Sequence, residues 1–141
     1  MTRSLSAVAV YCASNRGLHA ADAEVAARTG RRLAERRIRL VYGGGHVGLM
    51  GVLADAALAA GGEVHGVITR ALHDREVAHT GLTRLDLVDT MHERKAVMAD
   101  AADAFVMLPG GFGTLDEFFE VLTWTQLRIH DKACGLSLIH I

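Results

Sequence analysis

The sequence predicts a single-domain α/β fold in which helices flank a Rossmann-like, doubly wound parallel sheet. Three observations predict it. Short apolar runs alternate with longer segments of helical character along the chain. Several of these runs are nearly continuous in Val, Ile and Leu, which is typical of strands buried on both faces of a parallel sheet. With 141 residues the chain is also too short to supply two ordinary hydrophobic cores, so we expect residues 1–141 to form one domain.

The expected elements follow one another in a regular order. The runs SAVAVY, IRLVY, VHGVI, LDLV, AFVML and a weaker final run predict strands at Ser6–Tyr11, Ile38–Tyr42, Val64–Ile68, Leu85–Val88, Ala104–Leu108 and Gly135–Ile139. The segments between them predict helices at His19–Arg37, Val47–Ala60, Met91–Ala101 and Leu115–Arg128. Strands that alternate with helices of this length imply right-handed crossovers between parallel strands.

Residues at the helix ends support these assignments. Thr90 and Glu93 have the spacing of a capping box at the start of the third helix, and Thr114 and Glu117 repeat that spacing at the start of the fourth. Four arginines between positions 31 and 37 fall in the last turns of the first helix, where cations complement the helix dipole. We therefore interpret the arginines as a helix end and not as a nucleic-acid surface.

The composition excludes several classes of protein. Half of the residues are apolar, which is incompatible with disorder, and the formal net charge of −1 gives no electrostatic basis for binding nucleic acid or an anionic membrane. Cys12 and Cys134 are too few for a disulfide framework and fit a reducing compartment. No apolar run reaches the roughly 18 residues of a membrane span, and the first residues do not resemble a signal peptide. We expect a soluble cytoplasmic protein.

Ligands of open parallel sheets bind at the carboxyl ends of the strands, close to the point where the strand order reverses. Four loops leave strand ends there: Cys12–Gly17, Gly43–Gly48, the stretch after Val88, and Pro109–Thr114. The second of these, GGGHVG, matches the dinucleotide fingerprint literally. However, it follows the second strand, and the strand after it does not end in the acidic residue that would hold a ribose. We therefore do not predict NAD binding. Its glycines are expected to allow a close approach of the backbone to a ligand or to a neighbouring helix.

The loop after the fifth strand gives a sharper signal. Pro109–Glu117 (PGGFGTLDE) places three glycines between an apolar strand and a helix, so that backbone N–H groups are exposed at the positive end of that helix. This arrangement suits a phosphate group, although the Lys-Ser/Thr pair of a P-loop is missing. Glu117 alone is explained at least as well by helix capping.

A second cluster opens the preceding helix. Arg94 and Lys95 place two cations in its first turns, against the helix dipole, at a cost of a few tenths of a kcal/mol unless an anion neutralises them. A guanidinium beside a glycine-rich anion loop is a credible clamp for a phosphate or a leaving group. A solvated Arg-Lys pair remains the alternative.

At these residues the sequence resembles the "lonely guy" family of cytokinin riboside 5′-monophosphate phosphoribohydrolases, which older descriptions call possible lysine decarboxylases. The resemblance rests on Met91–Lys95 (MHERK) and on PGGFGTLDE. Supporting matches are YGGG, GLMG, LTWTQL and IHDK, at Tyr42–Gly45, Gly48–Gly51, Leu122–Leu127 and Ile129–Lys132. The resemblance extends over the chain as far as about Gly135.

This resemblance implies a nucleotide-binding domain that hydrolyses the N-glycosidic bond of a purine nucleoside 5′-monophosphate to the free base and ribose 5-phosphate. Family members act on N6-prenylated AMP, and some bacterial relatives also accept AMP. Arg94 and Glu117 match the catalytic pair. The substrate-contacting positions match Ser14, Glu76, Arg94, Lys95, Gly110, Gly111, Phe112, Gly113, Thr114 and Thr123, with Asn15 as a further candidate beside Ser14.

The residue types fit this chemistry. Cleavage of an N-glycosidic bond generates an oxocarbenium-like sugar, which a carboxylate such as Glu117 can stabilise while it orients water. Because its guanidinium is always charged, Arg94 is better suited to bind phosphate or polarise the leaving base than to act as a general acid. No cofactor or metal is expected, since the eight histidines form no zinc-like spacing. His46 and His92 are expected at strand ends that face the site.

Two departures from the family pattern and two open alternatives remain. The family usually continues for several elements beyond Gly135, so this chain is shorter at its C-terminus, and Asp116 stands where a second glutamate is more common. Apolar residues on more than one face of the last predicted helix, together with the dimers common among relatives, predict a homodimer. A non-catalytic nucleotide- or cofactor-binding module is the alternative function. Amino-acid decarboxylation is disfavoured, since Lys95 is a poor candidate for a pyridoxal-phosphate lysine.

Overall fold

The computed structural model describes residues 4–14, 20–75, 77–110 and 112–136. The described strands are β1 (Ala7–Tyr11), β2 (Arg39–Tyr42), β3 (Val64–Thr69), β4 (Arg84–Val88), β5 (Ala104–Met107) and β6 (Ala133–Leu136). The described helices are α1 (Ala20–Glu35), α2 (Gly48–Ala59), α3 (Arg70–His73), α4 (Met91–Ala101) and α5 (Phe112–Gln126). Strands and helices alternate along the chain, as the sequence predicts.

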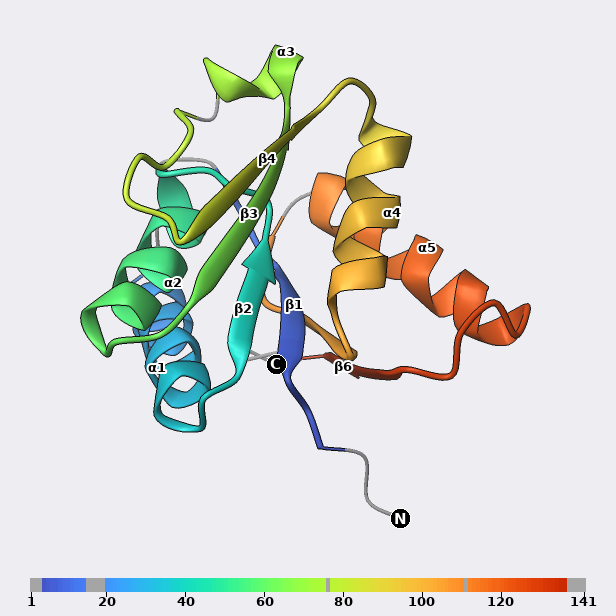
Figure 1. The fold of residues 1–141 in the computed structure, drawn as a ribbon, viewed down its shortest axis with the longest axis horizontal. Helices are drawn as coiled ribbons and strands as arrows, with labels where there is room; N and C mark the ends of the chain where they lie inside the picture. The colour runs from blue at the N-terminus through green and yellow to red at the C-terminus, as the bar shows by residue number, and fades with distance from the viewer. Residues whose placement is uncertain (1–3, 15–19, 76, 111, 137–141) are drawn as a thin grey trace.

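The strands form one sheet in the order β4-β3-β2-β1-β5-β6, and every pairing is parallel. From β1 the chain adds β2, β3 and β4 on one side and then crosses to the other side of β1 to place β5 and β6 (Figure 1). The strand order therefore reverses between β1 and β5. In open parallel sheets this switch point opens a crevice at the carboxyl ends of the two strands.

Helices cover both faces of the sheet (Figure 1), which confirms the predicted fold class. All five residues of β1 are buried, and alternate residues belong to two separate halves of the core. On one face, α1 and α2 bury Ala26, Leu53 and Ala57 against Val8, Val10 and Leu40. On the other face, α4 and α5 bury Met98, Phe118 and Val121 against Ala9, Val67 and Phe105.

The two helices on the first face pack unusually closely because α1 contains a glycine at the contact. A Cβ atom at Gly30 would lie 3.1 Å from the backbone nitrogen of Ala57 on α2 and would collide with the carbonyl oxygen of Leu53. Glycine inside a helix costs about 0.5–1 kcal/mol relative to alanine. Here that cost is offset by direct backbone-to-backbone packing of α1 on α2.

The structure differs from the predicted elements at three places. β6 begins two residues before the predicted strand, at Ala133, and α3 is a helix of four residues that is too short to produce a periodic apolar pattern. α5 begins at Phe112, so Thr114 lies within the helix and is not its N-cap. The predicted capping box of Thr114 and Glu117 is therefore wrong.

The predicted Thr90 cap of α4 is confirmed. Thr90 precedes α4 in an extended conformation, and its hydroxyl accepts a hydrogen bond of 3.1 Å from the backbone N–H of Glu93. The carboxylate of Glu93 accepts a hydrogen bond of 3.3 Å from the N–H of Asp89, the residue before Thr90. No helix within the described residues is long and apolar enough to cross a membrane.

Candidate functional site

The loops that follow β1 and β5 meet at the switch point. The N–H of Leu108 donates to the carbonyl of Tyr11 at 2.8 Å, and the N–H of Ala13 donates to the carbonyl of Pro109 at 3.2 Å. These bonds bring Ser14, which is partly buried, to the same edge of the sheet as Gly110. Asn15 and Gly111 lie outside the described residues. Two of the four predicted ligand loops are therefore side by side.

The glycine-rich loop folds back on the start of α5. A Cβ atom at Gly110 would lie 2.7 Å from the Cβ atom of Thr114, so only glycine fits this approach. Thr114 is itself buried. Phe112 and Gly113 form the first turn of α5, which places the unpaired N–H groups of that helix beside the loop. This is the geometry that suits a bound anion.

Glu117 occupies an unexpected place for a carboxylate. The buried residues of α5 include Thr114, Glu117, Phe118 and Val121, which have the i, i+3, i+4, i+7 spacing of a single helix face turned to the core. Glu117 is only 7% exposed within this face. Carboxylates are seldom buried this far, and a buried titratable group beside a loop at the switch point is a candidate for a functional role.

Arg94 is the largest fully buried side chain of the described residues. From the first turns of α4 its Nε donates to the carbonyl of Val67 at 2.9 Å, and its Nη2 donates to the carbonyl of Gly43 at 2.7 Å. The third nitrogen, Nη1, lies 3.8 Å from the sulfur of Met91. The guanidinium thus ties α4 to the end of β3 and to the glycine loop after β2. The sequence analysis did not predict these hydrogen bonds from Arg94 to backbone carbonyls.

The glycines of the GGGHVG segment serve internal packing. A Cβ atom at Gly43 would collide with the guanidinium of Arg94 and would lie 2.7 Å from the terminal carbon of Met50. The backbone of Gly44 has a φ of +79°, in the region that favours glycine. The space that a side chain at residue 43 would need is filled by Arg94.

Lys95 is neutralised by the protein itself. Its Nζ lies 2.7 Å from Oδ2 of Asp116 and 2.6 Å from Oε2 of Glu120, both on α5. Burial disfavours the charged lysine, but the hydrogen bonds that Lys95 donates to Asp116 and Glu120 outweigh burial and raise the pKa of Lys95 above its ordinary value. The anion that sequence reasoning required near Lys95 is therefore supplied by α5.

Tyr11 joins Glu117 and Arg94 at the end of β1, and sequence reasoning missed it. Its ring is buried and stacks on Phe105 with a centroid separation of 6.4 Å. Burial raises the pKa of Tyr11 far above its ordinary range, the negative charge of Glu117 raises it further, and the positive charge of Arg94 opposes them. The three groups share one electrostatic environment. A tyrosine at the end of an apolar strand carries no sequence signal that separates it from core.

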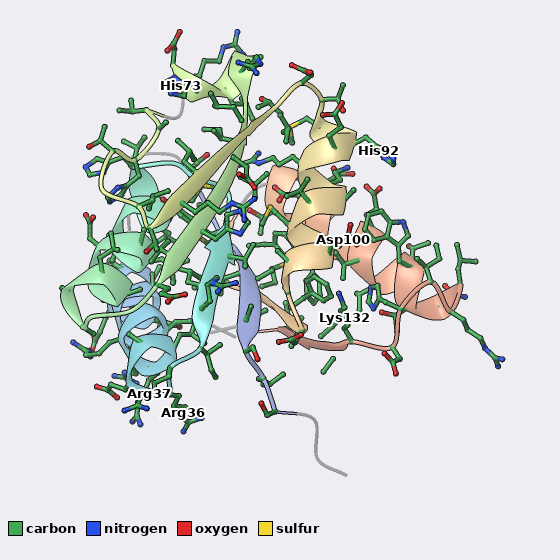
Figure 2. All side chains as sticks on the ribbon, in the orientation of Figure 1. Arg36, Arg37, His73, His92, Asp100 and Lys132 are labelled. Atoms are coloured by element: carbon green, nitrogen blue, oxygen red, sulfur yellow. The ribbon has the colours of Figure 1, made fainter. Side chains whose placement is uncertain are left out.

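Other predicted residues lie elsewhere. Thr123 is exposed on α5, six residues or about 9 Å along the axis beyond Glu117, and its hydroxyl donates to the carbonyl of Phe119 at 2.8 Å. Glu76 lies outside the described residues. His92 projects from the start of α4 away from the sheet (Figure 2), so the expectation that it faces the site is wrong. Arg36 and Arg37 lie beyond α1, at the end of the sheet opposite to His92 (Figure 2).

One group of metal-ligand residues occurs near this edge among the described residues: His46, Asp55 and His79. The N–H of Gly81 donates to Nδ1 of His79 at 2.9 Å, so this nitrogen is an acceptor and the ring proton lies on Nε2. Nε2 then donates to Asp55 at 2.6 Å. With that proton in place, Nε2 offers no lone pair to a metal ion. The group holds the backbone segment around His79 against α2.

Comparisons with known proteins show the family to which the chain belongs. Residues 50–139 match the model of the family described as "Possible lysine decarboxylase". A cytokinin riboside 5′-monophosphate phosphoribohydrolase from Rhodococcoides fascians is 52% identical over 130 residues, which cover 92% of this chain and 66% of that protein. The cytokinin riboside 5′-monophosphate phosphoribohydrolase LOG from Oryza sativa subsp. japonica is 50% identical over 129 residues, which cover 92% of this chain and 53% of that protein. The chain thus spans about half to two thirds of the length of these curated relatives.

A solved structure supports the fold. The molybdenum cofactor binding protein from Rippkaea orientalis superimposes with a TM-score of 0.74 over 96% of this chain and 77% of that one, at 18% identity. This identity is low enough that the likeness concerns the fold alone. Since the family model spans more than half of the chain, the protein belongs to the possible lysine decarboxylase family, the "lonely guy" family that its motifs resemble.

Proposed function

We propose that the protein hydrolyses the N-glycosidic bond of cytokinin riboside 5′-monophosphates, and of AMP, to the free base and ribose 5-phosphate. The observation that carries the proposal is the buried carboxylate of Glu117, set in the core-facing stripe of α5 next to the glycine loop at the switch point. Relatives at about 50% identity are named for the same reaction, which supports the proposal.

The chemistry assigns a task to each group. The Gly110–Thr114 segment and the first turn of α5 bind the 5′-phosphate through backbone N–H groups and the helix dipole. This places the ribose near Glu117, whose negative charge stabilises the oxocarbenium-like sugar as the bond from C1′ to the base nitrogen breaks. Water supplies the hydroxyl group to C1′, and its proton accounts for the one that the released base takes up. Because Glu117 is shielded from solvent, its charge acts on the sugar with little screening.

For Arg94 the contacts favour a role in shaping the site. Two of its nitrogens already donate to the carbonyls of Val67 and Gly43, so the cation is held at a fixed place beneath the loops. Its charge contributes to the field in which the anionic substrate binds. We propose Ser14, Glu76 and Thr123, with the glycine loop, as the remaining substrate contacts that the family resemblance implies.

We also propose that the protein works as a homodimer in the cytoplasm. Phe119 and Leu127 on α5 are 59% and 64% exposed, and Ile129 after the helix is 64% exposed. Large apolar side chains grouped at one place on a surface are typical of subunit interfaces. Thr123 lies among them, which supports a site completed by a second subunit. Within the described residues Cys12 and Cys134 form no disulfide, which fits a reducing compartment.

The non-catalytic module is the other reading, and Glu117 distinguishes it. A protein that only binds a nucleotide gains nothing from a buried carboxylate beside the phosphate site, because the two negative charges repel. Incubation with isopentenyladenosine 5′-monophosphate, AMP and the corresponding nucleosides, followed by chromatography of the free base, tests the proposal. We expect release from the monophosphates only. Binding without release would favour the non-catalytic module.

A further inference from the structure

Lys95 connects α4, which carries Arg94, to α5, which carries Glu117. Its ammonium group on α4 contacts Asp116 at 2.7 Å and Glu120 at 2.6 Å. The two carboxylates are four residues apart and therefore lie on one face of α5, one turn above the other. The side chain of Lys95 is 13% exposed and that of Glu120 26% exposed, so part of this ion-paired cluster is shielded from water.

The cluster of Lys95, Asp116 and Glu120 holds α5 through a helix face that adjoins its buried, core-facing stripe. Glu117 directly follows Asp116, about 100° further round the helix, and lies on the stripe with Phe118 and Val121. Apolar packing of that stripe alone tolerates small rotations of a helix, because hydrophobic contact is not directional. A lysine bonded to two successive turns of α5 restricts both its rotation and its position along the axis. The rotation of α5 and its position along the axis together determine where the Glu117 carboxylate lies.

The charge of the cluster argues against Lys95 as a phosphate ligand. The cluster of Lys95, Asp116 and Glu120 carries one positive and two negative charges, so its net charge repels a phosphate. To reach a phosphate, the ammonium group would also have to leave two short, partly buried hydrogen bonds. The charge is already satisfied within the protein.

We infer that Lys95 is a positioning residue for the proposed hydrolysis: by bridging Asp116 and Glu120 it holds α5, and with it Glu117, at the reactive place. This inference rests on the proposed function of Glu117. It assigns to Lys95 a task different from the substrate contact that the family resemblance implies.

Glu120→Gln distinguishes positioning of α5 from phosphate binding, because the first changes kcat and the second changes KM. If Lys95 positions α5, loss of the Glu120 charge weakens the bridge, and kcat falls about tenfold or more while KM for the monophosphate stays nearly constant. If Lys95 binds phosphate, the same substitution releases the lysine, so KM falls and kcat is retained. That second result would overturn the inference. Lys95→Met should resemble Glu120→Gln, and Lys95→Arg should restore most of the lost kcat.

A spectroscopic reading keeps the test independent of activity. Trp124 is the only tryptophan of the chain and lies on α5, so its emission reports the packing of that helix. We expect Lys95→Met and Glu120→Gln to shift the emission alike, and the double variant to add little more. Glu63→Gln is the matched control, because it removes an ion pair of 3.1 Å with Arg39 outside α4 and α5, and it should change neither kcat nor emission.

The two proposals fail in different ways. If the wild-type protein releases no base from any monophosphate, the proposed function fails, while the coupled emission shifts still report whether Lys95 holds α5. If the wild-type protein is active, and Lys95→Met and Glu120→Gln change kcat independently of each other, the positioning role of Lys95 is refuted and the function stands.

Discussion

Arg94 donates a hydrogen bond of 2.7 Å to the carbonyl of Gly43, at a place where residue 43 has no room for a side chain. The buried guanidinium and the glycine therefore depend on each other. Through this contact the GGGHVG loop is held to α4, although the two segments are about 50 residues apart. The loop that resembles a dinucleotide fingerprint is in this protein a support for the candidate site.

Gly43→Ala should displace Arg94. The new Cβ atom would collide with the guanidinium and lie 2.7 Å from the Cε atom of Met50, so we expect the free energy of unfolding to fall by about 1–3 kcal/mol. Base release should fall with it. Thermal unfolding and the rate of base release measure both. Gly135→Ala is the control, since its nearest neighbour, Cγ2 of Val106, is 3.8 Å away. Equal behaviour of the two variants would contradict the account of Gly43.

Arg94→Met should lower stability as well as activity. It leaves the buried carbonyls of Val67 and Gly43 without the bonds that Arg94 donates, at about 1–3 kcal/mol for each group. Urea denaturation should show a lower free energy of unfolding with an unchanged m-value. Arg84→Met removes an arginine that is 67% exposed and should have a much smaller effect. If Arg94→Met loses activity at full stability, Arg94 acts on the substrate and not on the loops.

The bridge of Lys95 predicts a pH dependence on the alkaline side. Because the pKa of Lys95 is raised in the folded protein, its contribution to stability is complete below its ordinary pKa of 10.5 and is lost as the pH rises through the higher folded value. The difference in Tm between wild type and Lys95→Met should thus be constant from neutral pH to about pH 10 and shrink above it. The pKa of Tyr11 is also raised, so its contribution to stability is also lost at alkaline pH. Because Tyr11 is present in both proteins, it does not change the difference in Tm between them. A difference that persists unchanged above pH 11 would argue against the bridge.

Val77 has a φ of +47°, a conformation that a β-branched residue adopts only under strain. Its carbonyl accepts a hydrogen bond of 2.8 Å from the N–H of His46, which helps to hold the backbone there. Val77→Gly should raise the free energy of unfolding by about 0.5–1 kcal/mol, since relief of strain exceeds the entropy cost of glycine. Val88→Gly, in the extended backbone of β4, should lower it. Destabilisation by both substitutions would show that Val77 is not strained.

Most of the fold could be predicted because local signals and burial agree. The buried run of β1 and the Thr90 cap of α4 predict those elements to within a residue. The start of α5 could not be predicted, because its first turn contains Phe112 and Gly113, and glycine disfavours helix unless tertiary contacts override it. The short α3 offers too few residues for a periodic pattern.

The candidate site could be predicted in place but not in its internal contacts. Arg94 and Glu117 stand in motifs that follow strands of one parallel sheet, so the sequence predicts both at the side of the carboxyl ends. The partners of Lys95 and the carbonyls that Arg94 binds come from segments distant along the chain, and no spacing rule connects them. The burial of Tyr11 beside Glu117 depends on which face of β1 meets α5. These contacts require the packed structure.

The most direct test of the central claim is the rate of base release by Glu117→Gln from isopentenyladenosine 5′-monophosphate. The variant keeps the size of the side chain and removes its charge, so we expect the fold and substrate binding to be retained and kcat to fall about a hundredfold or more. Glu93→Gln, exposed at the start of α4 and still able to cap, should match wild type. Wild-type turnover by Glu117→Gln would contradict the account.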